Sequence, residues 1–504
     1  MKSRFVLATA LLVTALLPLS LSAQITQAEY AARREALAAL IGDGVLAALG
    51  SPEPEEDYIS FFQNSHFRYL TGFKEPNATL VLDIKGGRLL GQHLFVQPTN
   101  PAREAWTGRR LGVAGVKQSM SLEGQPDSVF PRLLDSLLAR SGATVLHIVG
   151  AYDPAHPVLT PDDQFVRAVV AKRPSLTVKS ANLAVLQLRR VKTAAELDLI
   201  KKAVAISVDA HREAMRAMAP GQNEFETQAL VEYTFRRNGA ERPSFSTIIG
   251  SGPNSTTLHY NADDRFFGDN DVVVMDIGAS YGGYSADVTR TIPVSGKYSA
   301  EQRAIYQIVR DAQAAAERQA RLNGPARALT DSASATLAAG LAKLGLIERA
   351  DATYDCDARA STPCRQLTLF YYHGLGHGIG LDVHDPGTAT TFGTLVAGSA
   401  FTIEPGIYVR ENILDIIPRT PRNLAMIQKI RSAAERYRNV GVRIEDDYIM
   451  TDQGLEWISR APREIDEIEA VMAEPWSGPA ARDKAKVEWY RLKAPPPLNG
   501  QRNN

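Results

Sequence analysis

Cysteine is nearly absent from this sequence, whose 504 residues include only Cys356 and Cys364. Neither belongs to a Cys-x-x-Cys pair or accompanies paired histidines, which argues against a thiolate metal site. The two are eight positions apart, and in an oxidising compartment such a pair is expected to close a small structural disulfide loop. Two free thiols are the alternative.

Net charge is absent too, because 56 lysines and arginines balance 56 aspartates and glutamates. The chain has no overall field to attract nucleic acid or an acidic surface, so function must reside in a local group of residues. Internal repeats of solenoid period are lacking, and after the N-terminal segment no apolar run is long enough to span a bilayer. We therefore expect no nucleic-acid partner, and no membrane association once the N-terminal segment is removed.

That N-terminal segment has the pattern of a secretory signal peptide. Lys2 and Arg4 precede an apolar run over residues 5–21, and small residues follow it. A retained membrane anchor fits less well, since the run is short and Pro18 lies near its end. No cysteine lies near the expected cleavage point, which argues against a lipid anchor. The sequence thus predicts that residues 1–23 are removed and that the protein is periplasmic or secreted.

The length predicts two to three domains. Residues 24–188 alternate β-rich runs such as ATLVLDI and TVLHIVG with helical stretches such as PRLLDSLLAR, a pattern typical of an α/β domain. The composition then changes, and Thr193 with Glu196 three positions later forms a capping box that opens a long amphipathic helix. We expect an α+β domain over residues 189–472, followed by a partly disordered extension at 473–504.

Within the second domain, the basic segment 411–439 interrupts the surrounding strand pattern. A solvated surface insertion is the favoured interpretation. A lid over a neighbouring site is the alternative.

Two aspartates mark a candidate site in VVVMDIGASYGGYSADVTRTI. Gly282 and Gly283 form a good two-residue hairpin turn, which places Asp276 opposite Thr289. Asp287 lies two residues before Thr289, so it is expected on the same face as Asp276 and diagonal to it. Like charges at that separation repel unless a cation lies between them. Two solvated aspartates on an exposed hairpin are the structural alternative.

Three of the nine histidines lie within twelve positions of YYHGLGHGIGLDVHDPG. His373 and His377 are four apart but lack the glutamate of a zinc-protease helix, and the alternating glycines would destabilise a helix by about 1 kcal/mol each. An extended, glycine-rich segment is expected instead, along which some group must approach the backbone closely, as in the wall of a site. Further acidic residues follow in FTIEPGIYV, which contains Glu404, and in VGVRIEDDYIM, where Arg443 and Glu445 share the polar face of a strand. Four carboxylates and one imidazole of this kind could hold two divalent ions.

The elements MDIGASYGGYSADVTRT, HGLGHGIGLDVHD, TIEPGIYV and GVRIEDD, in this order and spacing, resemble the metal-binding signature of the "pita-bread" metallopeptidases. That family includes aminopeptidase P, prolidase and methionine aminopeptidase. Upstream, QNSHFRYLTGFKEPNATLVL and AWTGRRLG resemble the N-terminal domain of aminopeptidase P, prolidase and creatinase, which methionine aminopeptidase lacks. The resemblance spans roughly residues 25–470, and it implies an α/β creatinase-like N-terminal domain followed by an α+β pita-bread catalytic domain.

The resemblance also implies roles for individual residues. Five positions match ligands of two divalent metal ions: Asp276, Asp287, His377, Glu404 and Glu445. Four more match residues that contact the substrate or support the ligands: His259, His373, His384 and Arg443. An oxygen-rich shell with a single imidazole favours Mn²⁺, with Zn²⁺ or Co²⁺ as alternatives.

The expected function is that of an Xaa-Pro aminopeptidase, which releases the N-terminal residue from peptides with proline second. A hydroxide bridging the two ions is expected to attack the scissile carbonyl. Glu404 would carry protons between the attacking water and the leaving nitrogen, and His384 or His373 would donate a hydrogen bond to the developing oxyanion. A prolidase, which cleaves only Xaa-Pro dipeptides and for which segment 411–439 could cap the substrate, is one alternative. A non-catalytic binding protein that reuses the fold is another.

A homo-oligomer, either a dimer or a tetramer, is expected from the same resemblance. Trp106 aligns with a tryptophan that in aminopeptidase P can reach the site of a neighbouring subunit. A tryptophan buried in the core of the N-terminal domain is the alternative.

Overall fold

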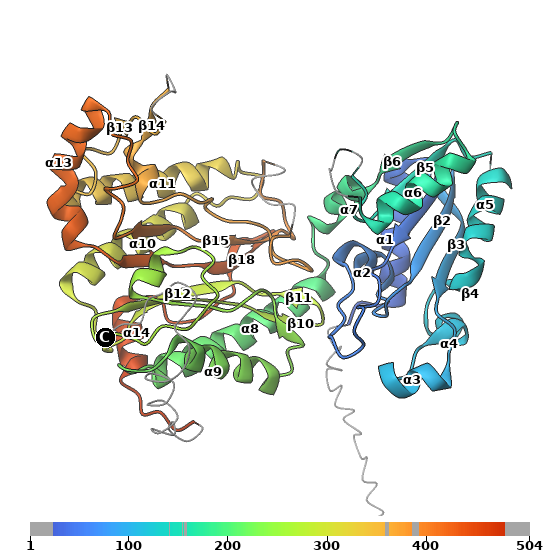
Figure 1. Ribbon diagram of the computed structural model, residues 1–504, viewed down its shortest axis with the longest axis horizontal. Coiled ribbons are helices and arrows are strands. Elements are labelled where there is room, and N and C mark those ends of the chain that lie inside the picture. Colours follow the sequence, from blue (N-terminus) through green and yellow to red (C-terminus); the bar gives the residue numbers. More distant parts are fainter. Residues whose placement is uncertain are drawn as a thin grey trace, which may run out of the picture.

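The computed structural model describes residues 24–478 apart from 141, 154, 156–158, 358–361 and 386–392. The expected signal peptide and most of the expected C-terminal extension lie outside the described residues. Figure 1 shows an α/β body formed by the N-terminal part and a larger body formed by the rest of the chain, which confirms the expected fold class. Along the described residues, no helix has the length and apolar character that a bilayer crossing requires.

The N-terminal body is built on a mixed six-stranded sheet of order β4-β3-β2-β1-β5-β6. Its strands are β1 (Gly44–Leu49), β2 (Thr79–Lys85), β3 (Arg88–Val96), β4 (Glu123–Pro126), β5 (Val145–Val149) and β6 (Thr177–Ser180). The helices are α1 (Gln27–Ile41), α2 (Ser65–Thr71), α3 (Pro101–Thr107), α4 (Gly112–Ser119), α5 (Phe130–Arg140), α6 (Pro161–Lys172) and α7 (Asn182–Arg189).

Strand β1 shows why the sheet is covered on both faces. Leu46 and Ala48 pack in one buried cluster with residues of α1 and α2, and Val45 and Ala47 pack in another with residues of α5 and α6. Successive side chains of a strand point to opposite faces, so an unbroken apolar run requires helices on both sides.

The second body places short antiparallel strands between two pairs of helices (Figure 1). One pair is α8 (Ala194–Ala217) and α9 (Glu224–Arg237), and the other is α10 (Ala300–Glu317) and α11 (Arg327–Leu344). The strands are β7 (Arg242–Pro243), β8 (Ile248–Ser251), β9 (Val272–Ile277), β10 (Ala279–Tyr281), β11 (Tyr284–Ser285), β12 (Val288–Pro293), β13 (Thr353–Tyr354), β14 (Cys364–Arg365), β15 (Ala400–Ile403), β16 (Gly406–Val409), β17 (Val440–Arg443), β18 (Asp446–Thr451) and β19 (Gly454–Trp457). Two further helices are α13 (Pro421–Arg436) and α14 (Ile465–Met472).

The start of the second body follows the sequence prediction. Thr193 caps α8. Its hydroxyl accepts from the backbone N–H of Glu196, and the Glu196 carboxylate accepts from the backbone N–H of Thr193. The buried cluster that contains Leu46 continues into α8 through Ala203, so one core crosses from the first body to the second. The domain division placed between residues 188 and 189 stays a prediction.

Segment 411–439 is more closely packed than a solvated insertion would be. Helix α13 buries Met426, Ile427 and Ile430 in the main hydrophobic cluster of the second body. Figure 1 places α13 beside β13 and β14, at the outer edge of this body. Its basic composition had pointed to a solvated surface, but the apolar residues recur at helical spacing and bury one face.

Two smaller predictions are also answered. Cys356 and Cys364 form a disulfide, as expected. Trp106 is 79% exposed on α3, which buries none of its residues, so the alternative of a core tryptophan is wrong.

Candidate metal centre and substrate cavity

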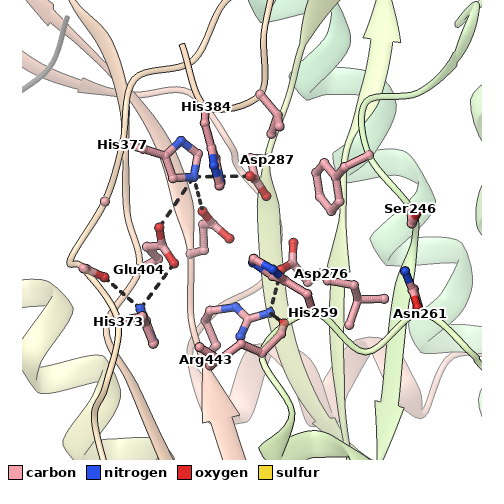
Figure 2. Close-up of a pocket in the computed structure, with 17 residues that line it drawn as sticks. Ser246, His259, Asn261, Asp276, Asp287, His373, His377, His384, Glu404 and Arg443 are labelled. Carbon is pink, nitrogen blue, oxygen red and sulfur yellow. Dashed lines mark hydrogen bonds and ion pairs between the residues drawn. The ribbon is translucent and has the colours of Figure 1, made fainter. Parts of the chain in front are cut away.

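The residues singled out in the sequence converge on one cavity of about 500 Å³ in the second body (Figure 2). It is lined by Phe245, Ser246, Ile248, Leu258, His259, Asn261, Asp276, Asp287, His373, Gly374, Gly376, His377, Val383, His384, Glu404, Arg443 and Glu445. All nine predicted site residues are in this set. Segment 411–439, which the structure describes throughout, contributes none of the lining.

The two aspartates come from the two arms of one hairpin, as the sequence predicts. Asp276 in β9 pairs with Thr289 in β12, and φ is positive at both Gly282 and Gly283. The hairpin nevertheless divides into two sheets at Gly278, where a Cβ would lie 1.9 Å from the carbonyl oxygen of Ala286. Asp287 therefore lies in the break between β11 and β12 rather than within a strand.

The backbone of Asp287 is held by a residue that the sequence argument did not identify. Its N–H donates to Oδ2 of Asp447 at 3.0 Å. Asp447 is buried behind the site, and burial raises its pKa well above the usual value. The second aspartate of the IEDD stretch, in an otherwise apolar strand, was the available signal.

Glu404 and Glu445 reach the cavity from the ends of other strands. Glu404 follows β15, and its N–H donates to the carbonyl of Leu375 at 2.7 Å. Glu445 lies between β17 and β18, where its backbone bridges to Thr289 and its Oε2 accepts from the Thr289 hydroxyl at 2.7 Å. These pairings bring residues from three sheets to one point.

His377 faces three carboxylates without donating to them. Its Nε2 lies 3.4 Å from Asp287, 3.5 Å from Glu404 and 3.7 Å from Glu445. Its Nδ1 lies 2.9 Å from the carbonyl of Gly378, which accepts the Nδ1 proton and leaves the Nε2 lone pair directed at the carboxylates. Burial lowers the pKa of His377 to about 4, so the ring is neutral. A lone pair surrounded by acceptors needs a cation.

The electrostatics of the carboxylates also indicate that the site needs a cation. Burial, and then the charges of Glu445 and Asp276, raise the pKa of Asp287 well above its usual value, and burial with Glu445 raises the pKa of Glu404 similarly. Burial and Asp276 raise the pKa of Glu445 to about 8. Among the described residues, buried oxygens of Asp276, Asp287 and Glu445 have no hydrogen-bond partner.

This donor set fits a divalent cation. Ligand atoms of Asp287, His377 and Glu445 lie within 4.8 Å of one another, and Asp276 and Glu404 line the same cavity. Carboxylate oxygens with one imidazole nitrogen are suitable ligands for such an ion. A cation among them would engage the unpartnered oxygens and neutralise the repulsion.

Arg443 joins this group to His373 through a tyrosine. It donates to Asp276 at 2.5 Å and to the hydroxyl of Tyr408 at 2.9 Å, and that hydroxyl lies 2.8 Å from Nε2 of His373. The Nδ1 of His373 lies 2.7 Å from the carbonyl of Gly374. Sequence reasoning missed Tyr408, although a tyrosine among the apolar residues of TIEPGIYV was a usable signal. Both ring nitrogens of His373 are thus engaged.

His384 and His259 complete the cavity wall. The rings of His384 and His377 are 4.2 Å apart between centroids. Burial, and secondarily His259, lowers the pKa of His384. Within the described part of the chain, neither ring nitrogen of His384 has a hydrogen-bond partner, which leaves this ring available to a ligand.

A buried glutamate of α9 supports the loop that carries His259. Glu224 accepts from the backbone of Ser251 at 2.7 Å, from the hydroxyl of Tyr260 at 2.8 Å and from the backbone of Arg265 at 2.8 Å. These bonds fix both ends of the loop over the cavity.

Residues 198–452 match the model of metallopeptidase family M24, and residues 30–146 match the aminopeptidase P N-terminal domain. An Xaa-Pro aminopeptidase of Haemophilus influenzae is 32% identical over 423 residues, which cover 82% of this chain and 88% of that protein. An Xaa-Pro aminopeptidase of Escherichia coli is 31% identical over 465 residues, covering 89% of this chain and 98% of that protein.

Solved structures agree with the sequence matches. Proline aminopeptidase P II from Yersinia pestis superposes with a TM-score of 0.75 at 30% identity, covering 89% of this chain and 100% of that one. Aminopeptidase P from E. coli with the inhibitor Pro-Leu gives 0.75 at 30% identity, covering 89% and 98%. The chain therefore belongs to metallopeptidase family M24 and carries an aminopeptidase P N-terminal domain ahead of its catalytic domain.

Proposed function

We propose that this protein is a metal-dependent Xaa-Pro aminopeptidase that releases the N-terminal residue from peptides with proline in the second position. The observation that carries the proposal is the cluster of three carboxylates, those of Asp287, Glu404 and Glu445, around the unprotonated Nε2 of His377, in a cavity large enough for a short peptide. The names of the relatives support the same substrate class.

Two divalent ions are proposed to occupy this cluster, held by Asp276, Asp287, His377, Glu404 and Glu445. The oxygen-rich donor set favours Mn²⁺ over Zn²⁺ or Co²⁺. When bound, such ions lower the pKa of water and polarise a carbonyl group.

The remaining steps are assigned to side chains of the protein. Glu404 as the carboxylate takes the proton of the attacking water and delivers it to the leaving proline nitrogen, because it lines the cavity between His373 and His377. His384 is the preferred donor to the developing oxyanion, since both ring nitrogens of His373 already bond to Tyr408 and Gly374. Tyr408 and Arg443 orient His373 as part of the wall that holds the substrate.

The structure favours an aminopeptidase over a prolidase. A strict dipeptidase must close the cavity beyond the proline, and segment 411–439 was the candidate cap. None of its residues lines the cavity, and α13 is packed into the core. A peptide extending past proline therefore meets no cap from this segment.

Hydrolysis of Xaa-Pro dipeptides and of a tripeptide such as Arg-Pro-Pro tests the proposal, with Mn²⁺ present and after chelation. Chelator-sensitive cleavage of the tripeptide is expected. Cleavage of dipeptides alone would identify a prolidase, and absence of metal binding would favour a binding protein that reuses the fold.

The location of the protein is proposed from its N-terminal sequence, and its assembly from the exposed Trp106. The N-terminal segment supports export to the periplasm or medium, which fractionation of cells expressing the full chain would test. A homo-oligomer is supported by the exposure of Trp106, since a large aromatic side chain in solvent is suited to a subunit contact. Light scattering of the wild type and of Trp106→Ala would test whether this residue holds a dimer or tetramer together.

A further inference from the structure

The two histidines proposed to face the substrate are held in different ways. The ring of His373 bonds to the Tyr408 hydroxyl and to the carbonyl of Gly374. The ring of His384 makes no such bond within the described chain, although it must point at the reacting carbonyl. Its position therefore depends on the backbone that carries it.

The next residue anchors that backbone. Asp385 is 3% exposed, and its carboxylate accepts from two cations, Arg189 at Oδ1 and Lys192 at Oδ2, the latter at 2.7 Å. Its N–H donates to the carbonyl of Gly378 at 2.8 Å. Charge-assisted bonds of this kind are stronger than neutral ones, and here both carboxylate oxygens are engaged. We call Arg189, Lys192 and Asp385 the Asp385 clamp.

The loop between Gly378 and Asp385 is closed around this carboxylate. A Cβ on Gly380 would lie 2.7 Å from the carboxyl carbon of Asp385, so a glycine is needed for the approach. The Gly380 carbonyl accepts from the backbone of Ser285 at 2.7 Å, which ties the loop to the strand just before Asp287. The clamp is therefore continuous with the wall of the cavity.

The clamp also reaches the N-terminal body. Arg189 ends α7, and its Nη1 lies 2.8 Å from Nδ1 of His66 in α2. Burial, and then the charge of Arg189, lowers the pKa of His66 to about 4, so its Nδ1 accepts the bond. Arg189 also donates to Asp382 at 2.6 Å, whose other oxygen accepts from Ser65. A single guanidinium thus joins the first body to the loop that carries His384.

We propose that Asp385 is a positioning residue for His384. Arg189, at the end of α7, and Lys192, between α7 and α8, hold the Asp385 carboxylate. The N-terminal body and its connection to the second body thereby set the orientation of the His384 ring. The inference rests on the proposed function, because it assigns His384 the contact with the reacting carbonyl. Misplacing a reacting group by about 1 Å is enough to lower a rate on the order of a hundredfold.

The first test compares Asp385→Asn with Asp382→Asn. Both remove one carboxylate from Arg189, but the Asp382 side chain is 47% exposed and does not bond Lys192. We expect kcat on a tripeptide to fall by at least about tenfold in Asp385→Asn, with KM within roughly threefold of wild type. Asp382→Asn should stay within about threefold in kcat. Equal losses in the two variants would overturn the proposal.

A double-mutant cycle separates positioning from general damage. If Asp385 acts through His384, Asp385→Asn should lower kcat by less than about twofold further in a His384→Ala background. An undiminished loss in that background would show that Asp385 acts elsewhere.

A second readout does not depend on activity. The chain has only nine histidines, so imidazole spectra of the histidine-labelled, metal-free protein are simple, and His384 is assigned from the signal missing in His384→Ala. Asp385→Asn should shift the His384 resonance and leave that of buried His211 unchanged. A His384 resonance that does not shift in Asp385→Asn would refute the proposal that Asp385 positions His384. A wild type that cleaves no Xaa-Pro peptide would refute the proposed function while leaving this spectrum to decide the clamp.

If Asp385→Asn does not fold, Asp385→Asn combined with Lys192→Met replaces it. That pair removes one buried charge of each sign, so the net buried charge of the clamp stays as it is in the wild type. The same shift of the His384 signal and the same loss of kcat are expected, and a wild-type spectrum and rate would overturn the proposal.

Discussion

Asp287→Asn should have opposite effects on the protein with and without metal. Ligand atoms of Asp287 and Glu445 lie within 4.8 Å of each other in a buried site. Two unit charges at this separation repel by about 3 kcal/mol at an effective dielectric constant of roughly 20. Asparagine keeps the shape and the N–H bond to Asp447 but removes one charge. The metal-free variant should therefore be the more stable protein by up to about 3 kcal/mol.

The size of that gain depends on pH. Burial and neighbouring carboxylates raise the folded-state pKa of Asp287 and Glu404 well above the usual values, and that of Glu445 to about 8. A carboxyl whose pKa is raised on folding destabilises the folded state as the pH rises from its unfolded value through its folded value. Stability of the metal-free wild type should fall between about pH 4 and pH 9, and Asp287→Asn should lose less. The difference in the free energy of unfolding between metal-free Asp287→Asn and metal-free wild type should be small at pH 5 and largest at pH 9.

The metal-loaded protein should respond in the opposite way. Asp287→Asn removes a proposed ligand, so one of two bound ions and nearly all turnover should be lost while the fold is retained. Urea unfolding with chelator at pH 5, 7 and 9, metal content and tripeptide hydrolysis are the measurements. Asp331→Asn, an aspartate whose side chain is 64% exposed on α11, is the matched control and should change stability by less than about 0.5 kcal/mol.

Either of two results would refute this reasoning. Full activity with two bound ions in Asp287→Asn would remove this residue from the ligand set. Destabilisation of the metal-free variant at pH 9 would show that carboxylate repulsion is not the dominant charge effect in the cluster.

Three other changes are expected to have distinct effects. Gly376→Ala should abolish most activity because its Cβ would lie 2.1 Å from a backbone oxygen of β15, whereas Gly374→Ala meets nothing within 4 Å and should remain active; equal kcat values for the two would contradict this. Tyr408→Phe removes the hydroxyl that orients His373, so kcat should fall by about tenfold without a change in metal content, and a wild-type rate would exclude that role. Replacing both disulfide cysteines by serine opens a link between positions eight apart and should lower the free energy of unfolding by about 2–3 kcal/mol, and unchanged urea unfolding would show that the link is not stabilising.

Much of the candidate site could be predicted from local sequence. The register of Asp276 opposite Thr289 follows from two glycines in a turn and from alternation along two strands, both of which act over a few residues. The close approach expected along the glycine-rich segment is present at Gly376 and Gly380. The resemblance to the family motifs then indicated which five of these residues are metal ligands.

Other features could not be read from local patterns. The break at Gly278 depends on the carbonyl of Ala286, and the burial of α13 depends on the core that it covers. From sequence alone, a basic helix with a narrow apolar face is predicted to be solvent-exposed. Its burial can be recognised only when the core surface that packs against the apolar face is known.

The sequence by itself determined which chemical groups are available and how neighbouring strands pair, because rotamers, turns and alternation act within short stretches of chain. Only the tertiary structure decided which of those groups meet. Glu445 and Thr289 bond across 156 positions, and Arg189 and Asp385 across 196. Such contacts arise from the packing of whole sheets and helices around a shared core, which fixes distances that no local pattern encodes.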